Sequence, residues 1–162
     1  MKRHELAHFV DTSMTCNAAS PAPSYALLGD GIESLTEEFN AETETKQWIN
    51  QENGTTLIKS YTPSISVERD DCIDDATRTW IKMIINTLPI GADAQTYVVR
   101  VDLTEEGSTS GTYVAYRRKF AVAAGSTGGD AGGDVIDSVV MSGVGDAVKG
   151  TFNPTTLTFT AD

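Results

Sequence analysis

The chain has 162 residues, 40% of them hydrophobic, which suits one domain with a core of its own. Its formal net charge of −11 excludes a protein that binds nucleic acid by neutralising phosphates, because such proteins need clustered Lys and Arg. Cys16 and Cys72 lack zinc-ligand or disulfide spacing, so we expect free thiols in a reducing compartment. No apolar run approaches the length that spans a bilayer, and we expect a soluble chain made in the cytoplasm.

The N-terminal part, residues 1–24, is predicted to be an arm with little core of its own. Residues 4–12 could form a short strand, whereas residues 13–24 are small and polar and contain two prolines. A strand from Tyr25 then reaches a Gly-Asp-Gly turn at 29–31. We expect this strand to pair as a hairpin with a second strand over residues 32–40.

Residues 40–62 are predicted to form a long projecting hairpin. Asn53-Gly54 is a strong signal for a two-residue turn, and folding the chain there places Lys46 opposite Tyr61. A long two-stranded ribbon is marginal in water by itself, so we expect another chain to support it. The residues expected to make that contact are Trp48, Ile49, Asn53, Gly54, Leu57 and Ile58.

One amphipathic helix is predicted over residues 71–88. Apolar residues recur there three or four apart, which is the spacing of one helix face. Asp70 or Asp71 is placed to cap its first turn, and Pro89 ends it. The residues expected on the packed face are Ile73, Ala76, Trp80, Ile84 and Leu88.

The remainder of the chain is rich in strand-forming residues. Segments 96–104 and 112–124 are predicted to form a second hairpin, followed by a flexible glycine-rich loop at 125–133. Two closing strands are expected over 135–150 and 151–160. The whole chain, 1–162, is therefore predicted to be one mainly β domain of β-sandwich or barrel-like form, with one flanking α-helix, a long protruding hairpin and extended terminal arms.

Candidate catalytic and metal-binding residues are few. His4 and His8 could bind a metal together, but no third ligand is evident, and we favour surface positions on an N-terminal strand. The acidic residues between Glu68 and Asp75 could attract Ca²⁺, yet they lack the order of a calcium loop, and helix capping accounts for them. No nucleophile with a nearby base is visible. We expect no enzyme activity, no cofactor and no metal.

Three adjacent cationic residues, Arg117, Arg118 and Lys119, stand out in this acidic chain. On a strand, Arg117 and Lys119 share one face while Arg118 takes the other, so they do not make one patch. Either they lie in a solvated face, or they pair with an acidic face of a neighbouring copy at a subunit interface.

The order of elements resembles the tail tube protein (major tail protein) family of tailed bacteriophages. The features that carry the resemblance are the hairpin with its Asn53-Gly54 tip, the single helix after it, the strand-rich second half and the ending KGTFNPTTLTFTAD. The resemblance implies a structural protein whose copies, six to a ring, stack into a hollow tube. DNA would pass through that tube without specific binding.

The resemblance also implies particular partners and a location. The partners would be further copies of the chain, a tape measure protein, a tail terminator and distal tail or baseplate proteins, without any membrane. The location would be the virion tail, after assembly in the host cytoplasm. The alternative is a monomeric β-sandwich that serves as a binding or adhesion module of a virion or cell surface.

Overall fold

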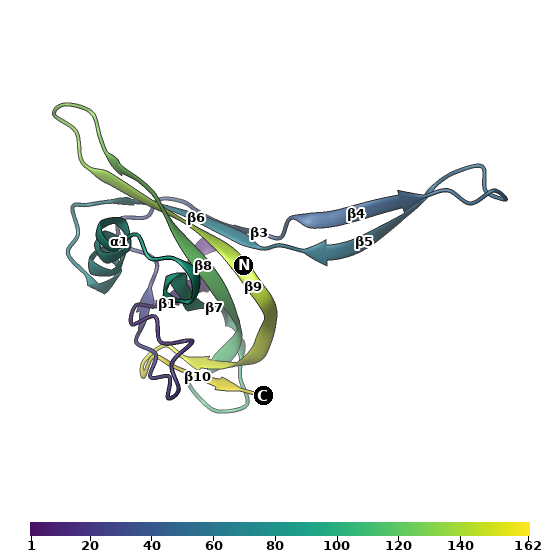
Figure 1. Cartoon of the computed structure of the whole chain (residues 1–162). Coiled ribbons are helices and arrows are strands. Elements are labelled where there is room, and N and C mark those ends of the chain that lie inside the picture. Colours follow the sequence, from purple (N-terminus) through teal and green to yellow (C-terminus); the bar gives the residue numbers. More distant parts are fainter.

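The computed structural model describes residues 1–162, and its regular structure is mainly β-strand (Figure 1). In chain order the elements are the 3-10 helix η1 (Arg3–Glu5), β1 (Leu6–Asp11), β2 (Tyr25–Leu27), β3 (Leu35–Glu38), β4 (Ala41–Lys46), β5 (Thr55–Tyr61), β6 (Ser64–Asp70), α1 (Ala76–Thr87), the 3-10 helix η2 (Gly91–Ala94), β7 (Gln95–Glu106), β8 (Tyr113–Gly128), β9 (Ile136–Asn153) and β10 (Thr158–Ala161). The predicted class, a mainly β domain with one flanking α-helix, is confirmed. None of the helices has the length and apolar character that a membrane-spanning helix requires.

Eight strands form one antiparallel sheet in the order β2-β1-β7-β8-β9-β6-β3, with β10 paired to the end of β9. The predicted hairpin of β7 and β8 is confirmed by their pairing. The two closing strands predicted over 135–160 differ from the structure, because β9 continues without a break to Asn153. The first half of β9 pairs with β6, and the end of β9 pairs with β10. The same edge of one long strand therefore pairs with two different strands.

The sheet curls until its two ends approach each other. Glu37 of β3 accepts a hydrogen bond from Arg100 of β7 at 2.9 Å and lies 3.6 Å from the imidazole of His8 in β1. Arg3 also reaches across, donating to the carbonyl of Leu35 at 3.5 Å. These side-chain contacts, rather than backbone pairing, close the barrel-like form.

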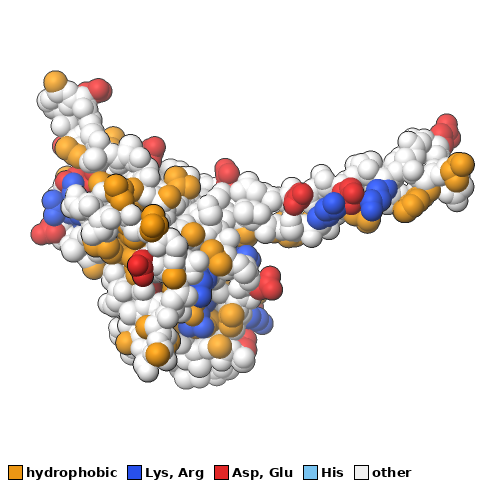
Figure 2. Space-filling view, viewed as in Figure 1, with side chains coloured by type: hydrophobic (Ala, Val, Ile, Leu, Met, Phe, Trp, Pro, Cys, Tyr) orange, Lys and Arg blue, Asp and Glu red, His pale blue; other side chains and the backbone are white.

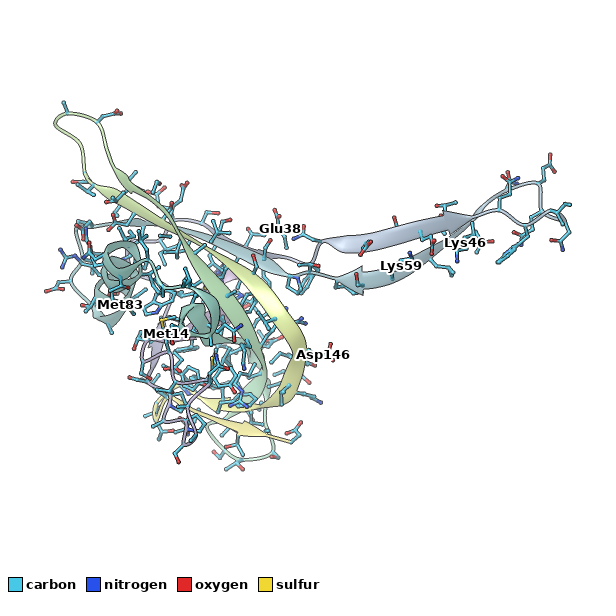
Figure 3. All side chains as sticks on the ribbon, viewed as in Figure 1. Met14, Glu38, Lys46, Lys59, Met83 and Asp146 are labelled. Carbon is cyan, nitrogen blue, oxygen red and sulfur yellow. The ribbon has the colours of Figure 1, made fainter.

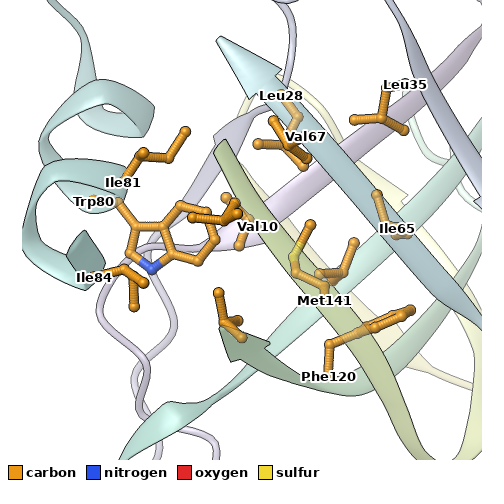
Figure 4. Close-up of a cluster of buried hydrophobic side chains, with 13 residues drawn as sticks. Val10, Leu28, Leu35, Ile65, Val67, Trp80, Ile81, Ile84, Phe120 and Met141 are labelled. Carbon is orange, nitrogen blue, oxygen red and sulfur yellow. The ribbon is translucent and has the colours of Figure 1, made fainter. Parts of the chain in front are cut away.

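Helix α1 covers one opening of the curled sheet, and the main core lies between them (Figure 4). Trp80, Ile81 and Ile84 are fully or almost fully buried. They pack with side chains from both halves of the sheet, among them Val10, Ile65, Val67, Phe120 and Met141. Met14 and Met83 lie at the margin of this core (Figure 3). Burial of side chains of this size stabilises the fold by about 1.5–3 kcal/mol each.

The helix begins later than predicted, at Ala76 instead of residue 71. Asp75 is its N-cap and accepts a hydrogen bond from the amide of Arg78 at 2.8 Å. Leu88 ends the helix in the left-handed conformation and is exposed, as are Ile73 and Ala76, so these three predicted packing residues are corrected. Ile73 precedes the helix, which removes it from the helical face.

A network of ion pairs explains why residues 71–74 are not helical. Asp71 binds both Arg78 and Lys82 of α1, and Lys82 also lies 3.0 Å from the buried Asp137 of β9. The carboxylate of Asp71 can contact both cations only if the chain before Asp75 turns away from the direction of the helix. Hydrogen bonds from Lys82 and Arg78 hold the pKa of Asp71 below its usual value, and the same contacts raise the pKa of both cations.

The short strand predicted within residues 4–12 is present as β1, but residues 6–11 do not belong to an arm. They form β1, which lies between β2 and β7 and is buried from Ala7 to Asp11. Ala7 and Phe9 point into a second core with Val99 and Phe152. Both faces of β1 are therefore covered, as befits an internal strand.

Two further local predictions are corrected by the observed strand pairing. The expected hairpin over 25–40 does not form, because β2 pairs with β1 and β3 pairs with β6. The glycine-rich segment 125–133 is not all loop, since β8 continues to Gly128 and pairs there with Ile136. The connecting loop occupies residues 129–135 at the end of a second, shorter projection (Figure 1).

Candidate assembly surface

Strands β4 and β5 form a two-stranded ribbon that pairs with no other strand. The ribbon extends away from the body of the molecule (Figures 1 and 2). Every residue of these two strands is exposed apart from the half-buried Glu44. A ribbon with this much exposed backbone and side-chain surface is marginal in water, so it calls for a partner.

The turn at the ribbon tip differs from the predicted one. Lys46 pairs with Thr55, not with Tyr61, and the connection is a loop over residues 47–54. The side chain of Gln47 donates to the carbonyls of Gln51 and Glu52 at 3.2 and 3.0 Å, which stabilises the wider loop. Asn53-Gly54 closes this loop onto β5 instead of forming a two-residue turn.

The two faces of the ribbon differ in charge. Directly paired side chains share one face of a β-ladder, and alternate residues take opposite faces. One face carries Glu42, Glu44, Lys46 and Lys59, with Glu44 3.1 Å from Lys59 and 3.6 Å from Lys46. We call this the charged face, and its members are Glu42, Glu44, Lys46, Thr55, Leu57, Lys59 and Ser60.

The opposite face contains no charged residue. Thr45 and Thr56 are paired across it with their hydroxyls 2.9 Å apart, and Thr43 is paired with Ile58. We call this the neutral face, and its members are Ala41, Thr43, Thr45, Thr56, Ile58 and Tyr61. Figure 2 shows the acidic and basic side chains gathered along the ribbon, and Lys46 and Lys59 are labelled in Figure 3.

The structure places the six predicted contact residues in three groups. Trp48 and Ile49 lie in the tip loop, where the Trp48 side chain is 58% exposed and Ile49 is fully exposed. Asn53 and Gly54 end that loop. Leu57 lies on the charged face, and Ile58 lies on the neutral face, so the hairpin brings together only part of the predicted set.

The threonines and Tyr61 of the neutral face were not among the residues predicted from the sequence. Their signal is the alternation in residues 41–46, Ala-Glu-Thr-Glu-Thr-Lys, in which every second residue is charged. Such a period of two predicts a strand with one charged and one uncharged face. The turn assumed at Asn53-Gly54 paired these residues in the wrong register and concealed the pattern.

The cationic residues predicted at a subunit interface all have contacts within the chain. The Arg117 guanidinium lies between the rings of Tyr97 and Phe159, 4.4 and 4.6 Å from their centroids. Arg118 donates to the carbonyl of Gly145 at 2.8 Å. Lys119 donates to Asn17 at 2.8 Å. These contacts assign the three side chains a role in holding strands and loops of their own chain.

The two histidines are not brought together. His4 is exposed in η1, whereas His8 is buried beside Glu37. Burial acts to raise the pKa of Glu37, but contact with His8 and the charge of Arg100 outweigh it, and the pKa lies below its usual value. No group of three His, Cys, Asp or Glu side chains is arranged to hold a metal ion.

The largest cavity, of about 870 Å³, opens near the seam where the sheet ends meet. Its walls are mostly apolar and include Phe9, Leu27, Leu35 and Leu103. Arg3, His4 and Glu33 also line it, without the convergent set of polar groups that a small-molecule site needs. The ribbon is the feature of the molecule that most clearly lacks a partner.

The fold is similar to that of chains in the tails of phage-like particles. No family model matches the chain, and no curated protein matches it. Among solved structures, a chain of the tail of an empty gene transfer agent particle, refined with C6 symmetry, aligns with a TM-score of 0.63 at 14% identity over 99% of both chains. A chain of the SPP1 tail tube aligns with a TM-score of 0.63 at 14% identity, over 92% of this chain and 78% of that one.

A third structure, the tube-terminating cap of the anti-feeding prophage, aligns with a TM-score of 0.52 at 8% identity, over 93% of this chain and 91% of that one. These likenesses extend over nearly the whole length of the protein. The chain therefore has the fold of phage tail tube proteins, which confirms the fold that the resemblance implied.

Proposed function

We propose that the protein is a structural, non-enzymatic subunit of a tail tube, whose copies form rings that stack into a hollow cylinder. The observation that carries this proposal is the near-complete overlap with a chain of a C6-symmetric tail, which also favours rings of six. A self-assembling subunit also accounts for an exposed ribbon that finds no partner within its own chain.

The ribbon is proposed to make contacts between rings. Trp48 and Ile49 at its tip, with Asn53, Gly54, Leu57 and Ile58, are the candidate contact residues. Large exposed apolar side chains on a projecting element would bury surface in the next copy, which favours association by about 25 cal/mol per Å² of apolar area. The contacts that Arg117, Arg118 and Lys119 make within their own chain weaken the proposal that these cations pair with a neighbouring copy.

The proposed partners follow from the tube. They are further copies of the chain, a tape measure protein inside the tube, a terminator at one end and distal tail or baseplate proteins at the other. The tube would belong to a virion tail assembled in the host cytoplasm. The net charge of −11 suits a passage for DNA, because few cations are available to retain phosphates.

The test is electron microscopy of the purified protein over a concentration series, with light scattering on the same samples. Tubes or stacked rings that grow with concentration are expected from the wild type. Trp48→Asp should abolish stacking because it places a charge in the buried contact, and Glu52→Gln in the same loop serves as the control. A monomer at every concentration would favour the alternative, a monomeric binding or adhesion module.

A further inference from the structure

The ribbon has two faces of different chemistry, and this difference points to the one that a partner covers. On the charged face, Glu44 lies within 3.6 Å of both Lys46 and Lys59, so the charges there have partners already. Such exposed pairs lose hydration if they are covered, and that loss offsets the attraction between the charges. We therefore expect the charged face to remain exposed to solvent.

The neutral face carries no such cost. Its exposed groups are methyls, the aliphatic chain of Ile58, the ring of Tyr61 and threonine hydroxyls. The hydroxyls of Thr45 and Thr56 lie 2.9 Å apart and can satisfy each other when water is removed. Covering this face buries apolar surface without leaving a charge unpaired.

The body of the molecule offers a surface of matching chemistry. A groove of about 420 Å³ lies between the end of α1 and the exposed side of β8 and β9, and no charged residue lines it. Leu88 and Ile90 are 63% and 84% exposed on one side of the groove. Its floor is formed by the small residues Ala121, Ala123 and Ser142. In a chain of net charge −11, an uncharged groove is a place where a second copy can approach without repulsion.

The other large cavity is a poorer match. Arg3, His4 and Glu33 line it, and an uncharged ribbon face would remove these groups from water without pairing them. Resting on the proposed function, we propose that the neutral face of the ribbon docks into the α1–β8 groove of a second copy, while the charged face stays in water. This docking removes Leu57 from the candidate contact residues, because Leu57 lies on the charged face. The contact is heterologous, because different surfaces of the two copies meet, and it can therefore extend into a stack.

Matched substitutions on the two faces test which one is covered. Ile58→Asp and Thr45→Glu place charges on the neutral face, and Leu57→Asp and Thr55→Glu place the same charges on the charged face. All four positions are exposed, so circular dichroism and thermal unfolding of the monomer should be unchanged. The neutral-face variants should raise the concentration needed for tubes by about a hundredfold or more, because an unpaired charge would be buried. The charged-face variants should shift it less than about threefold, as expected of surface substitutions.

The groove is tested by Ala123→Glu, with Ala147→Glu on the exposed part of β9 as the control. Only the first should prevent tubes. Ile58→Asp keeps an intact groove and Ala123→Glu keeps an intact ribbon, so an equimolar mixture should form small complexes that contain both variants. Neither variant alone should form them. Size-exclusion chromatography with light scattering, using one tagged variant, measures this.

Each outcome bears on the proposal. Equal effects from the two faces, stronger effects at Leu57 and Thr55, or no co-elution in the mixture would overturn the docking assignment while wild-type tubes uphold the proposed function. Hydroxyl-radical footprinting of wild-type tubes gives a check without substitutions, since Ile58 and Tyr61 should become protected relative to Leu57. Absence of any wild-type assembly would overturn the proposed function and this inference with it.

Discussion

Glu37 of β3 lies 2.9 Å from Arg100 of β7, although β8, β9 and β6 stand between these two strands in the sheet. The ion pair therefore joins parts of the sheet that the backbone hydrogen bonds leave apart. Glu37→Gln should lower the free energy of unfolding by about 1–3 kcal/mol, because it weakens this contact and the one with His8 in a partly buried place. Urea denaturation measures the loss. Glu38→Gln, on the exposed face of the same strand, is the control and should change stability little.

The same carboxylate makes stability depend on pH. The pKa of Glu37 is lower in the folded chain than its ordinary value, so its contribution is complete above about pH 4.3, the ordinary glutamate pKa. It is lost as the pH falls through the folded pKa. The urea midpoint of the wild type should therefore decrease more steeply below about pH 4.3 than that of Glu37→Gln. Parallel pH profiles for the two proteins would show that Glu37 is not the source.

The later start of α1 can be tested by comparing two isoleucines. Ile84→Ala should cost about 2–5 kcal/mol, because Ile84 is fully buried between the helix and the sheet. Ile73→Ala should change stability by less than about 0.5 kcal/mol, because Ile73 is exposed and precedes the helix. Thermal or urea unfolding measures both. Similar losses at the two positions would instead support a helix that begins near residue 71.

Asp11 is expected to hold the loop after β1 in place. Its buried carboxylate accepts hydrogen bonds from the amides of Ser13, Thr15 and Ser24, at 3.1, 3.2 and 2.9 Å. Asp11→Ala should lower stability by about 1–3 kcal/mol, because these donors lose a charged acceptor. Limited proteolysis should then cut within residues 13–24. Asp30→Ala, at an exposed turn, should leave that segment resistant.

Gly150 is expected to be needed for the last strand to dock. A Cβ at this position would lie 2.2 Å from the carbonyl oxygen of Thr160 in β10. Gly150→Ala should therefore displace β10, and hydrogen exchange over 158–161 should accelerate. Gly133→Ala, where the nearest atom is 3.5 Å away, is the control and should leave exchange unchanged.

Local patterns predicted the parts of the fold that depend on neighbouring residues. The β7–β8 hairpin and the core position of Trp80 follow from alternation and from helical spacing. The pairing of β1 with β7 could not be predicted from local patterns, because the paired residues Leu6 and Asp102 lie far apart in the sequence. The hairpin expected over 25–40 failed for the same reason, since each of its strands has a distant partner.

The candidate site was predicted in position but not in detail. The polarity of residues 40–62 and the exposed Trp48 indicated a projecting hairpin. Its register depends on hydrogen bonds from the Gln47 side chain to the loop backbone, which no turn rule contains. That register decides which face holds Leu57 and which holds Ile58, so the β5 members of each face could be assigned only from the structure.

The position of β1 inside the sheet affects how the chain folds during synthesis. Strand β1 is among the first segments to be synthesised. It can pair with β7 only after residues 95–106 have left the ribosome. Until then Phe9 and Val10 have no core to enter, and an unpaired apolar strand is prone to aggregate. The ribbon, whose Lys46 and Thr55 are close in sequence, has no such delay. The two strands of the ribbon can thus meet before the body is complete, but a ribbon that is marginal by itself becomes a lasting docking surface only when the body or a second copy supports it.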